Sequence, residues 1–178
     1  MATNPTRTLG RIQHFQAVEH AFSCGLAEAV GSRNLVLLLQ ATSRFGDWGL
    51  STAGALLLLA VQGPRVFTLY LAFTLLGVAL QSGLKRLCSR TRPCHRADGP
   101  PQRAPIPDRG SFPSGHTLHA VMTAGVMVAL IPLVAPLFVV AAILMAASRV
   151  VLGVHYPTDV AAGAVLGGLF ATLIVSMV

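Results

Sequence analysis

Acidic side chains are scarce in this chain, which has six Asp and Glu residues among its 178 residues. Charged residues of both signs make up 11% of the sequence, well below the roughly 25% of an average water-soluble domain, and 53% of the residues are hydrophobic. Six scattered carboxylates leave no cluster that could hold a magnesium ion. So few charges exclude an ordinary soluble protein, and the length suits one domain. We therefore predict an integral membrane protein.

Cysteine is rarer still, with three residues. Cys24, Cys88 and Cys94 are an odd number, at no spacing typical of metal ligands. This excludes a disulfide framework in which every thiol is paired. We expect three free thiols, with a Cys88–Cys94 disulfide as the alternative.

Basic residues outnumber acidic ones and give a formal net charge of +7. In a soluble protein this excess would suggest a nucleic-acid partner. Here the basic residues stand beside apolar segments, where anionic lipid headgroups are the nearer partner. We expect a membrane-embedded protein that binds no nucleic acid; no oligomeric state follows from the sequence.

Long apolar segments recur along the chain. A hydrocarbon core of about 30 Å needs roughly twenty residues of helix. Five segments come close to this length, at residues 48–61, 66–84, 117–134, 136–152 and 160–178. Residues 32–43 could form a sixth. The sequence thus predicts an all-α fold, a polytopic transmembrane bundle of five to six membrane helices.

The N-terminal part has a different pattern. Residues 12–40 mix charged and apolar side chains, and the apolar ones recur at three- and four-residue intervals from Phe15 and Val18 onwards. This pattern is typical of an amphipathic helix lying in the membrane interface. Within a single domain overall, we expect an interfacial region over residues 1–46 and a transmembrane region over residues 47–178.

Three short polar clusters interrupt the apolar segments. They are Lys85 with Arg92-Pro93, then Pro113-Ser114-Gly115-His116, then Ser148-Arg149 with His155 and Asp159. An even number of predicted crossings separates them, so they should lie on one side of the membrane. Cations, histidines and a carboxylate at one edge of an apolar bundle are suited to bind a phosphate group beside a nucleophile.

The first cluster carries two cations seven residues apart. On a helical exit from the bilayer this spacing brings Lys85 and Arg92 to the same face. Arginine offers a planar fork for two phosphate oxygens, and lysine offers a point charge. For Arg86 and Arg90 we expect no more than an interfacial position, with side chains that reach toward the headgroups.

The second cluster directly precedes an apolar helix. Its backbone N–H groups should therefore lie at a helix N-terminus, which is favourable for an anion. Gly115 would allow the close backbone approach that a phosphate needs. His119 follows nearby, and we expect it to be an ordinary helix-face residue.

The third cluster surrounds the start of the last apolar segment. Pro157 fits the first turn of a helix, which places His155 just before that helix and Asp159 within its first turn. A carboxylate that accepts from one imidazole nitrogen fixes the tautomer and leaves the other nitrogen free to attack.

Together the clusters resemble the three-part signature of the type 2 phosphatidic acid phosphatase (PAP2) superfamily, which also contains vanadium haloperoxidases. Eleven specified positions agree in order with no departure. The resemblance extends from about residue 45 to the end and implies a PAP2-type catalytic domain over residues 47–178.

The family's roles carry over to matching positions. The resemblance implies that His155 is the nucleophile that forms a phosphohistidine, that Asp159 orients it, and that His116 is the general acid. It assigns phosphate binding to Lys85, Arg92, Ser114, Gly115 and Arg149. Because carboxylates are scarce, we expect catalysis without a metal or another cofactor, and inhibition by vanadate.

The resemblance implies a lipid phosphate phosphatase of the bacterial inner membrane. The small size and short loops are similar to those of bacterial carrier-lipid phosphatases, which favours a polyisoprenyl substrate such as undecaprenyl diphosphate. Phosphatidic acid, phosphatidylglycerophosphate, a lipid A phosphate and phosphorylated sugar-lipid intermediates stay open, because the motifs bind only the shared phosphate. Two other classes are less favoured: a haloperoxidase would be soluble, and intact histidines argue against a non-catalytic lipid-binding protein.

Two arguments disagree on which side the site faces. Basic residues concentrate on the motif side and the opposite loops offer only Arg65, which by the positive-inside rule indicates the cytoplasm. Most bacterial relatives face the periplasm, however, and a phosphate site collects arginines for its own use. We expect the periplasmic side, with a cytoplasmic site as the alternative.

Overall fold

A computed structural model describes residues 5–106 and 108–178. Over these ranges the chain forms α1 (Pro5–Ala29), α2 (Arg33–Gln62), α3 (Pro64–Cys88), the short 3-10 helix η1 (Pro93–His95), α4 (Gly115–Leu130), α5 (Ala135–Val151) and α6 (Pro157–Ser176). The described residues form no strand beyond an isolated bridge between Thr91 and Gly110. The predicted all-α fold is confirmed.

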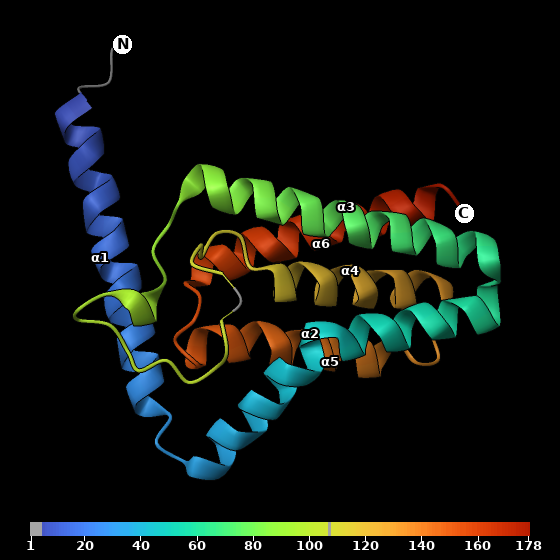
Figure 1. The fold of residues 1–178 in the computed structure, drawn as a ribbon, viewed down its shortest axis with the longest axis horizontal. Helices are drawn as coiled ribbons and strands as arrows, with labels where there is room; N and C mark the ends of the chain where they lie inside the picture. The colour runs from blue at the N-terminus through green and yellow to red at the C-terminus, as the bar shows by residue number, and fades with distance from the viewer. Residues whose placement is uncertain (1–4, 107) are drawn as a thin grey trace.

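The helices form a long bundle with α1 standing across one end (Figure 1). The loop that follows α3 lies at this same end, between α1 and the bundle.

Glycine and proline residues set where several helices begin and end. Gly63, at a φ of 85°, makes the tight turn between α2 and α3, and Pro64 and Pro157 begin α3 and α6. Pro132 follows the end of α4 and cannot continue it.

Two helices, α3 and α6, are long and apolar enough to cross a membrane. A third span is possible if the bent pair Gln13–Ala29 and Arg33–Gly46 counts as one broken span. Three shorter apolar helices, Trp48–Gln62, α4 and α5, accompany them. All five predicted apolar segments are thus helical over most of their length, although the third ends at Leu130 and not at residue 134. The expected five to six spans, however, include helices of 16 and 17 residues, which cover only about 24–26 Å.

The helix α1 turns its apolar side outward. Phe15, Val18 and Phe22 are each more than half exposed, whereas Glu19 and His20 on the same helix are buried. A helix with this pattern faces an apolar medium on one side and polar groups of the protein on the other. This agrees with the interfacial helix expected from the sequence.

The expected single helix over residues 12–40 is in fact divided. The chain turns at residues 30–32, and the two flanking segments are bent by 118°. Gly31 lies in this turn, where its lack of a side chain favours a break in the helix. The helix α2 then continues without a break across the boundary that we expect between residues 46 and 47.

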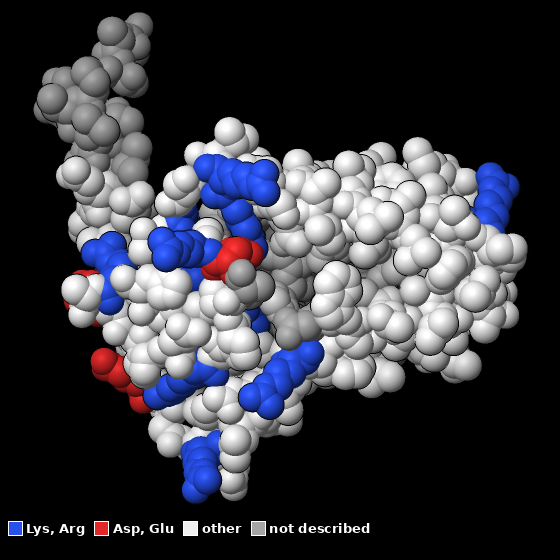
Figure 2. Space-filling model, in the orientation of Figure 1, with Lys and Arg blue, Asp and Glu red and all other residues white. Residues whose placement is uncertain are grey.

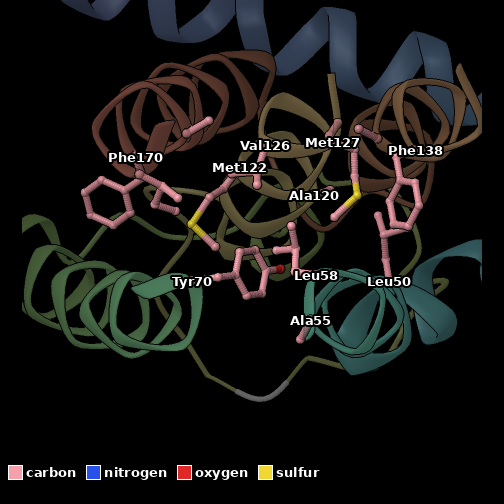
Figure 3. Packing of buried hydrophobic residues seen from close by; sticks show 14 of the residues in the cluster. Leu50, Ala55, Leu58, Tyr70, Ala120, Met122, Val126, Met127, Phe138 and Phe170 are labelled. Carbon is pink, nitrogen blue, oxygen red and sulfur yellow. The ribbon is translucent and has the colours of Figure 1, made fainter. Parts of the chain in front are cut away.

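The hydrophobic core surrounds α4 (Figure 3). Met122 of α4 is fully buried, and side chains of α2, α3, α5 and α6 pack around this helix, among them Leu58, Tyr70, Phe138 and Phe170. Burial of these large side chains on all sides of α4 fixes the N-terminus of that helix relative to its neighbours.

Glycines let α6 approach α4 closely. A Cβ atom added at Gly163 would lie 2.4 Å from the Ser114 carbonyl oxygen, and one at Gly167 would lie 2.3 Å from that of Leu118. Small residues at a membrane helix contact allow this backbone approach. The contact holds the start of α6 beside the start of α4.

Basic side chains gather at the end of the bundle that carries α1 and the long loop (Figure 2). Arg65 lies at the other end, where its Nη2 is 3.3 Å from the Met177 carbonyl oxygen. The polar clusters and most of the positive charge therefore lie on one side, as the sequence predicts.

All three cysteines are free thiols, and Cys88 is exposed while Cys24 and Cys94 are partly buried. The alternative of a Cys88–Cys94 disulfide is wrong.

Candidate active site

Helix ends position all eight site residues predicted from the sequence. Lys85 lies in the last turn of α3, Arg92 directly precedes η1, and Arg149 lies in the last turn of α5. Ser114 caps α4, with Gly115 and His116 in its first turn, while His155 and Asp159 lie before and within the first turn of α6. The structure brings all of them to the same end of the bundle.

The His155 imidazole is buried and lies between a cation and a carboxylate. Its Nε2 is 3.0 Å from Nη1 of Arg92, and its Nδ1 is 3.6 Å from Oδ2 of Asp159. A guanidinium can only donate, so Nε2 accepts and the proton of the neutral ring belongs on Nδ1. The lone pair of Nε2 is therefore directed toward the guanidinium of Arg92.

Burial keeps this ring neutral. Burial, with smaller contributions from Arg92 and Arg149, lowers the pKa of His155 to about 3, although Asp159 opposes the shift. At neutral pH the ring is unprotonated, which is the state that a nucleophile requires.

Asp159 is held on several sides. Its Oδ2 accepts from the Tyr156 backbone N–H at 2.8 Å and from the Ser111 hydroxyl. Its Oδ1 lies 2.7 Å from Nη1 of Arg90. The carboxylate is fully buried and also caps the N-terminus of α6, where a negative charge is favourable.

Arg90 reaches inward, so the expectation that it only extends toward the headgroups is wrong. Besides Asp159, its guanidinium contacts Oγ1 of Thr158 at 2.7 Å and Oε2 of Glu19 at 2.5 Å. It also stacks 4.1 Å above the Tyr156 ring. The sequence did not predict this role, because the position of Arg90 in the sequence does not distinguish it from Arg86.

Glu19 connects α1 to the start of α6. Its Oε1 accepts from the Thr158 backbone N–H at 2.8 Å and from the Thr158 hydroxyl at 2.5 Å. Its other oxygen pairs with Arg90. The N-terminal helix is thereby tied to the residues around Asp159.

Asp108, from the long loop, bridges the two cations of the first cluster. Its Oδ2 lies 2.8 Å from Nζ of Lys85 and its Oδ1 lies 3.0 Å from Nη2 of Arg92. Burial alone would raise the pKa of Asp108, but these cations hold it below its ordinary value. A carboxylate therefore lies between the two cations that the sequence predicts to bind the phosphate. Sequence reasoning missed this residue.

Arg149 is almost completely buried and donates to the Ser43 hydroxyl of α2. Its carbonyl oxygen accepts from the His155 backbone N–H at 3.1 Å. The segment that carries His155 is thus fixed to the end of α5.

The start of α4 is closely packed. Ser114 is buried, and its backbone N–H donates to the Asp159 carbonyl oxygen at 3.0 Å. A Cβ atom at Gly115 would lie 1.6 Å from Oε1 of Gln81. Gln81 therefore lies directly over the first turn of α4, and a larger residue at position 115 would have to displace its side chain.

A cavity of about 430 Å³ adjoins these residues. Lys85, Asp108, Gly115 and His116 line it, together with residues of α2 and α3. It is large enough for part of a substrate beyond the phosphate.

Among residues 5–106 and 108–178, no three His, Cys, Asp or Glu side chains lie close enough together to hold a metal ion. Metal independence stays a prediction.

Known proteins are similar to this chain in sequence and in fold. A sequence model of the PAP2 superfamily matches residues 66–178. The decaprenylphosphoryl-5-phosphoribose phosphatase of Mycobacterium tuberculosis (strain H37Rv) is 40% identical over 94 residues, which cover 53% of this chain and 51% of that protein. The lipid A 1-phosphatase of Rhizobium johnstonii is 37% identical over 58% of this chain and 45% of its own length. The chain thus spans about half the length of these two relatives.

A longer match is found in Mycolicibacterium smegmatis, whose decaprenylphosphoryl-5-phosphoribose phosphatase is 36% identical over 82% of this chain and 81% of its own length. Two crystal structures share the fold. A transmembrane PAP2-type phosphatidylglycerolphosphate phosphatase from Bacillus subtilis has a TM-score of 0.75 at 23% identity, covering 92% of this chain and 86% of its own. Aquifex aeolicus LpxE has a TM-score of 0.73 at 21% identity, covering 85% of this chain and 91% of its own. Because the family model matches more than half of the chain, this protein belongs to the PAP2 superfamily.

Proposed function

We propose that this protein is a membrane lipid phosphate phosphatase that acts through a phosphohistidine without a metal. The observation that carries the proposal is the placement of Nε2 of a neutral, buried His155 at 3.0 Å from Arg92. A nucleophile beside a phosphate-binding cation is the arrangement that in-line phosphoryl transfer requires. The phosphatase names of the relatives support the same activity.

In the first step, Nε2 of His155 attacks phosphorus and the bond from phosphorus to the leaving oxygen breaks. His116 gives its proton to that oxygen, while Lys85, Arg92 and Arg149 neutralise the other phosphate oxygens. In the second step His116 takes a proton from water, which attacks phosphorus, breaks the P–N bond and releases inorganic phosphate. Asp159 holds the Nδ1 side of the ring throughout.

For the substrate we propose a polyisoprenyl lipid, with undecaprenyl diphosphate as the first candidate from the sequence resemblance. A second candidate is a polyisoprenyl-linked sugar phosphate. The names of the two mycobacterial relatives, which specify decaprenylphosphoryl-5-phosphoribose, favour it. Both candidates are isoprenoid lipids with a terminal phosphate, which is bonded to a second phosphate in the first candidate and to a sugar in the second.

The test is phosphate release in detergent with EDTA present. Wild type and His155→Ala are compared on undecaprenyl diphosphate, decaprenylphosphoryl-5-phosphoribose, phosphatidic acid and phosphatidylglycerophosphate. We expect wild-type release that vanadate inhibits and that His155→Ala abolishes, with a polyisoprenyl substrate preferred. Full activity of His155→Ala would refute the phosphohistidine, and loss of wild-type activity on EDTA treatment would refute metal independence.

We further propose that the site faces the periplasm. Cys88 ends α3 on the motif side and is exposed, so it can report the side directly. In a variant with Cys24→Ser and Cys94→Ser, a membrane-impermeant maleimide should label Cys88 in cells whose outer membrane is permeabilised. Labelling only after lysis of the inner membrane would place the site in the cytoplasm.

A further inference from the structure

The cavity beside the phosphate site extends away from it along α3. One face of α3 lines the cavity. Going back along the helix from Lys85, this face carries Gln81, Val78 and Thr74 at intervals of three and four residues. His119, one turn after His116 on α4, lines it as well. A molecule whose phosphate lies between Lys85 and His116 would therefore place its next atoms against Gln81 and His119.

In this cavity wall, Oε1 of Gln81 and both ring nitrogens of His119 are buried and have no hydrogen-bond partner within the described residues. Such atoms are rare in folded proteins, because a buried polar group without a partner loses its hydration and gains nothing in return. Two such side chains line one cavity, which makes them candidates to pair with a bound molecule.

Both side chains lie close to the backbone of the neighbouring helix. Oε1 of Gln81 lies against Gly115, and the His119 ring lies against α3, where a Cβ at Gly77 would be 2.9 Å from its Cε1. The unpaired atoms are buried just behind the cavity surface, so a bound group meets them once the end of the Gln81 side chain or the His119 ring turns toward the cavity.

A plain hydrocarbon chain would leave these atoms unpaired. Hydroxyl groups can satisfy them, since a hydroxyl donates to the amide oxygen of Gln81 and both donates to and accepts from an imidazole. The remaining wall, which includes Val78 and Trp48, is apolar and suits the carbon skeleton of the same group.

We propose that this cavity is a subsite for a hydroxyl-bearing group esterified to the phosphate, of the sugar or polyol class, and that Gln81 and His119 determine this specificity. The inference rests on the proposed function, because it places the leaving group of the same reaction. It favours a sugar phosphate on a lipid over a prenyl diphosphate, whose leaving group has no hydroxyls.

The test uses two soluble phosphates of equal carbon number, ribose 5-phosphate and pentyl phosphate, as inhibitors of lipid turnover. Only the first carries hydroxyls. We expect His119→Leu and Gln81→Leu each to weaken inhibition by ribose 5-phosphate roughly tenfold, the loss of about one hydrogen bond. Inhibition by pentyl phosphate and by vanadate should change less than twofold. His14→Leu, which removes an exposed histidine of α1, is the matched control.

Several outcomes would overturn the inference. Equal weakening of both phosphates would mean that the two side chains support only the phosphate site or the fold. Tighter pentyl phosphate binding with unchanged ribose 5-phosphate would mean that the cavity holds hydrocarbon. If His119→Leu does not fold, His119→Gln, which keeps polar atoms, should retain most of the preference for ribose 5-phosphate, and loss of that preference would count against the proposal.

Vanadate-sensitive lipid turnover in EDTA by the wild type tests the proposed function separately. If that turnover is absent while calorimetry shows that ribose 5-phosphate binds and that His119→Leu weakens this binding, the subsite is supported and the proposed reaction is not.

A final comparison identifies the source of the sugar phosphate. A much higher kcat/KM for decaprenylphosphoryl-5-phosphoribose than for ribose 5-phosphate would assign the subsite to a lipid headgroup, and equal values would assign it to a free sugar phosphate.

Discussion

Asp108 lies 2.8 Å from the Lys85 ammonium, so a carboxylate of the protein pairs with a cation that we propose binds the phosphate of the substrate. Its second oxygen pairs with Arg92. Both cations are largely buried, whereas the Asp108 side chain is 40% exposed. If Lys85 and Arg92 bind the phosphate as we propose, an incoming phosphate must displace Asp108 or share the two cations with it.

Replacement of Asp108 by asparagine should therefore strengthen anion binding. We expect Asp108→Asn to lower the inhibition constants of vanadate and inorganic phosphate roughly threefold, since a partly exposed ion pair contributes up to about 1 kcal/mol. Inhibition assays at neutral pH measure this. Asp98→Asn is the control, because Asp98 lies in the same loop but pairs with Arg96 and His20. Weaker vanadate inhibition in Asp108→Asn would show that the carboxylate organises the cations instead.

Arg90 should act on the reaction through Asp159. Arg90→Gln removes the cation that lies 2.7 Å from the Asp159 carboxylate, so His155 loses part of its orientation. We expect kcat to fall by at least tenfold with KM changed little, as is typical when a reacting group is misplaced. Glu19→Gln should give a smaller decrease in the same direction.

Arg86→Gln is the matched control for this variant, since Arg86 is an exposed arginine near the end of α3. Its kinetics should match the wild type. A rise in KM with unchanged kcat in Arg90→Gln would instead assign Arg90 to substrate binding.

Stability should fall in acid because of His155. Its folded pKa of about 3 lies below the ordinary value of 6.5, so between these values the unfolded chain binds one more proton than the folded one. The contribution of the neutral ring is complete above pH 6.5 and is lost as the pH falls, at about 1.4 kcal/mol per pH unit. Thermal unfolding in detergent at pH 7 and pH 5 tests this. The decrease should be smaller in His155→Gln, and equal decreases would contradict the assignment.

The contact between α4 and α6 should not tolerate a methyl group. In Gly163→Ala the new Cβ would lie 2.4 Å from the Ser114 carbonyl oxygen, so the helices must separate. We expect a loss of about 1–3 kcal/mol in the free energy of unfolding, together with loss of activity because Ser114 moves. Gly168→Ala, on the same helix with no atom within 4 Å of the added Cβ, should be neutral or stabilising. Thermal unfolding of both variants checks the difference.

The sequence by itself determined the helical class and the end of the bundle at which the polar clusters meet. Apolar segments of near-membrane length specify helices through their composition, and an even number of crossings returns the chain to the same side. The positions of Lys85, Arg92, His116, His155 and Asp159 at helix ends follow from these local signals.

Only the tertiary structure decided what surrounds these residues. Glu19 and Thr158 are 139 positions apart, and Arg90 meets Glu19 across 71 positions, so no local spacing encodes either contact. The same is true of Asp108 between the cations and of Gln81 against Gly115. Helical periodicity fixes which residues share a face of one helix, but which faces meet depends on how the helices pack, and the long loop and α1 reach the site only once the bundle has formed.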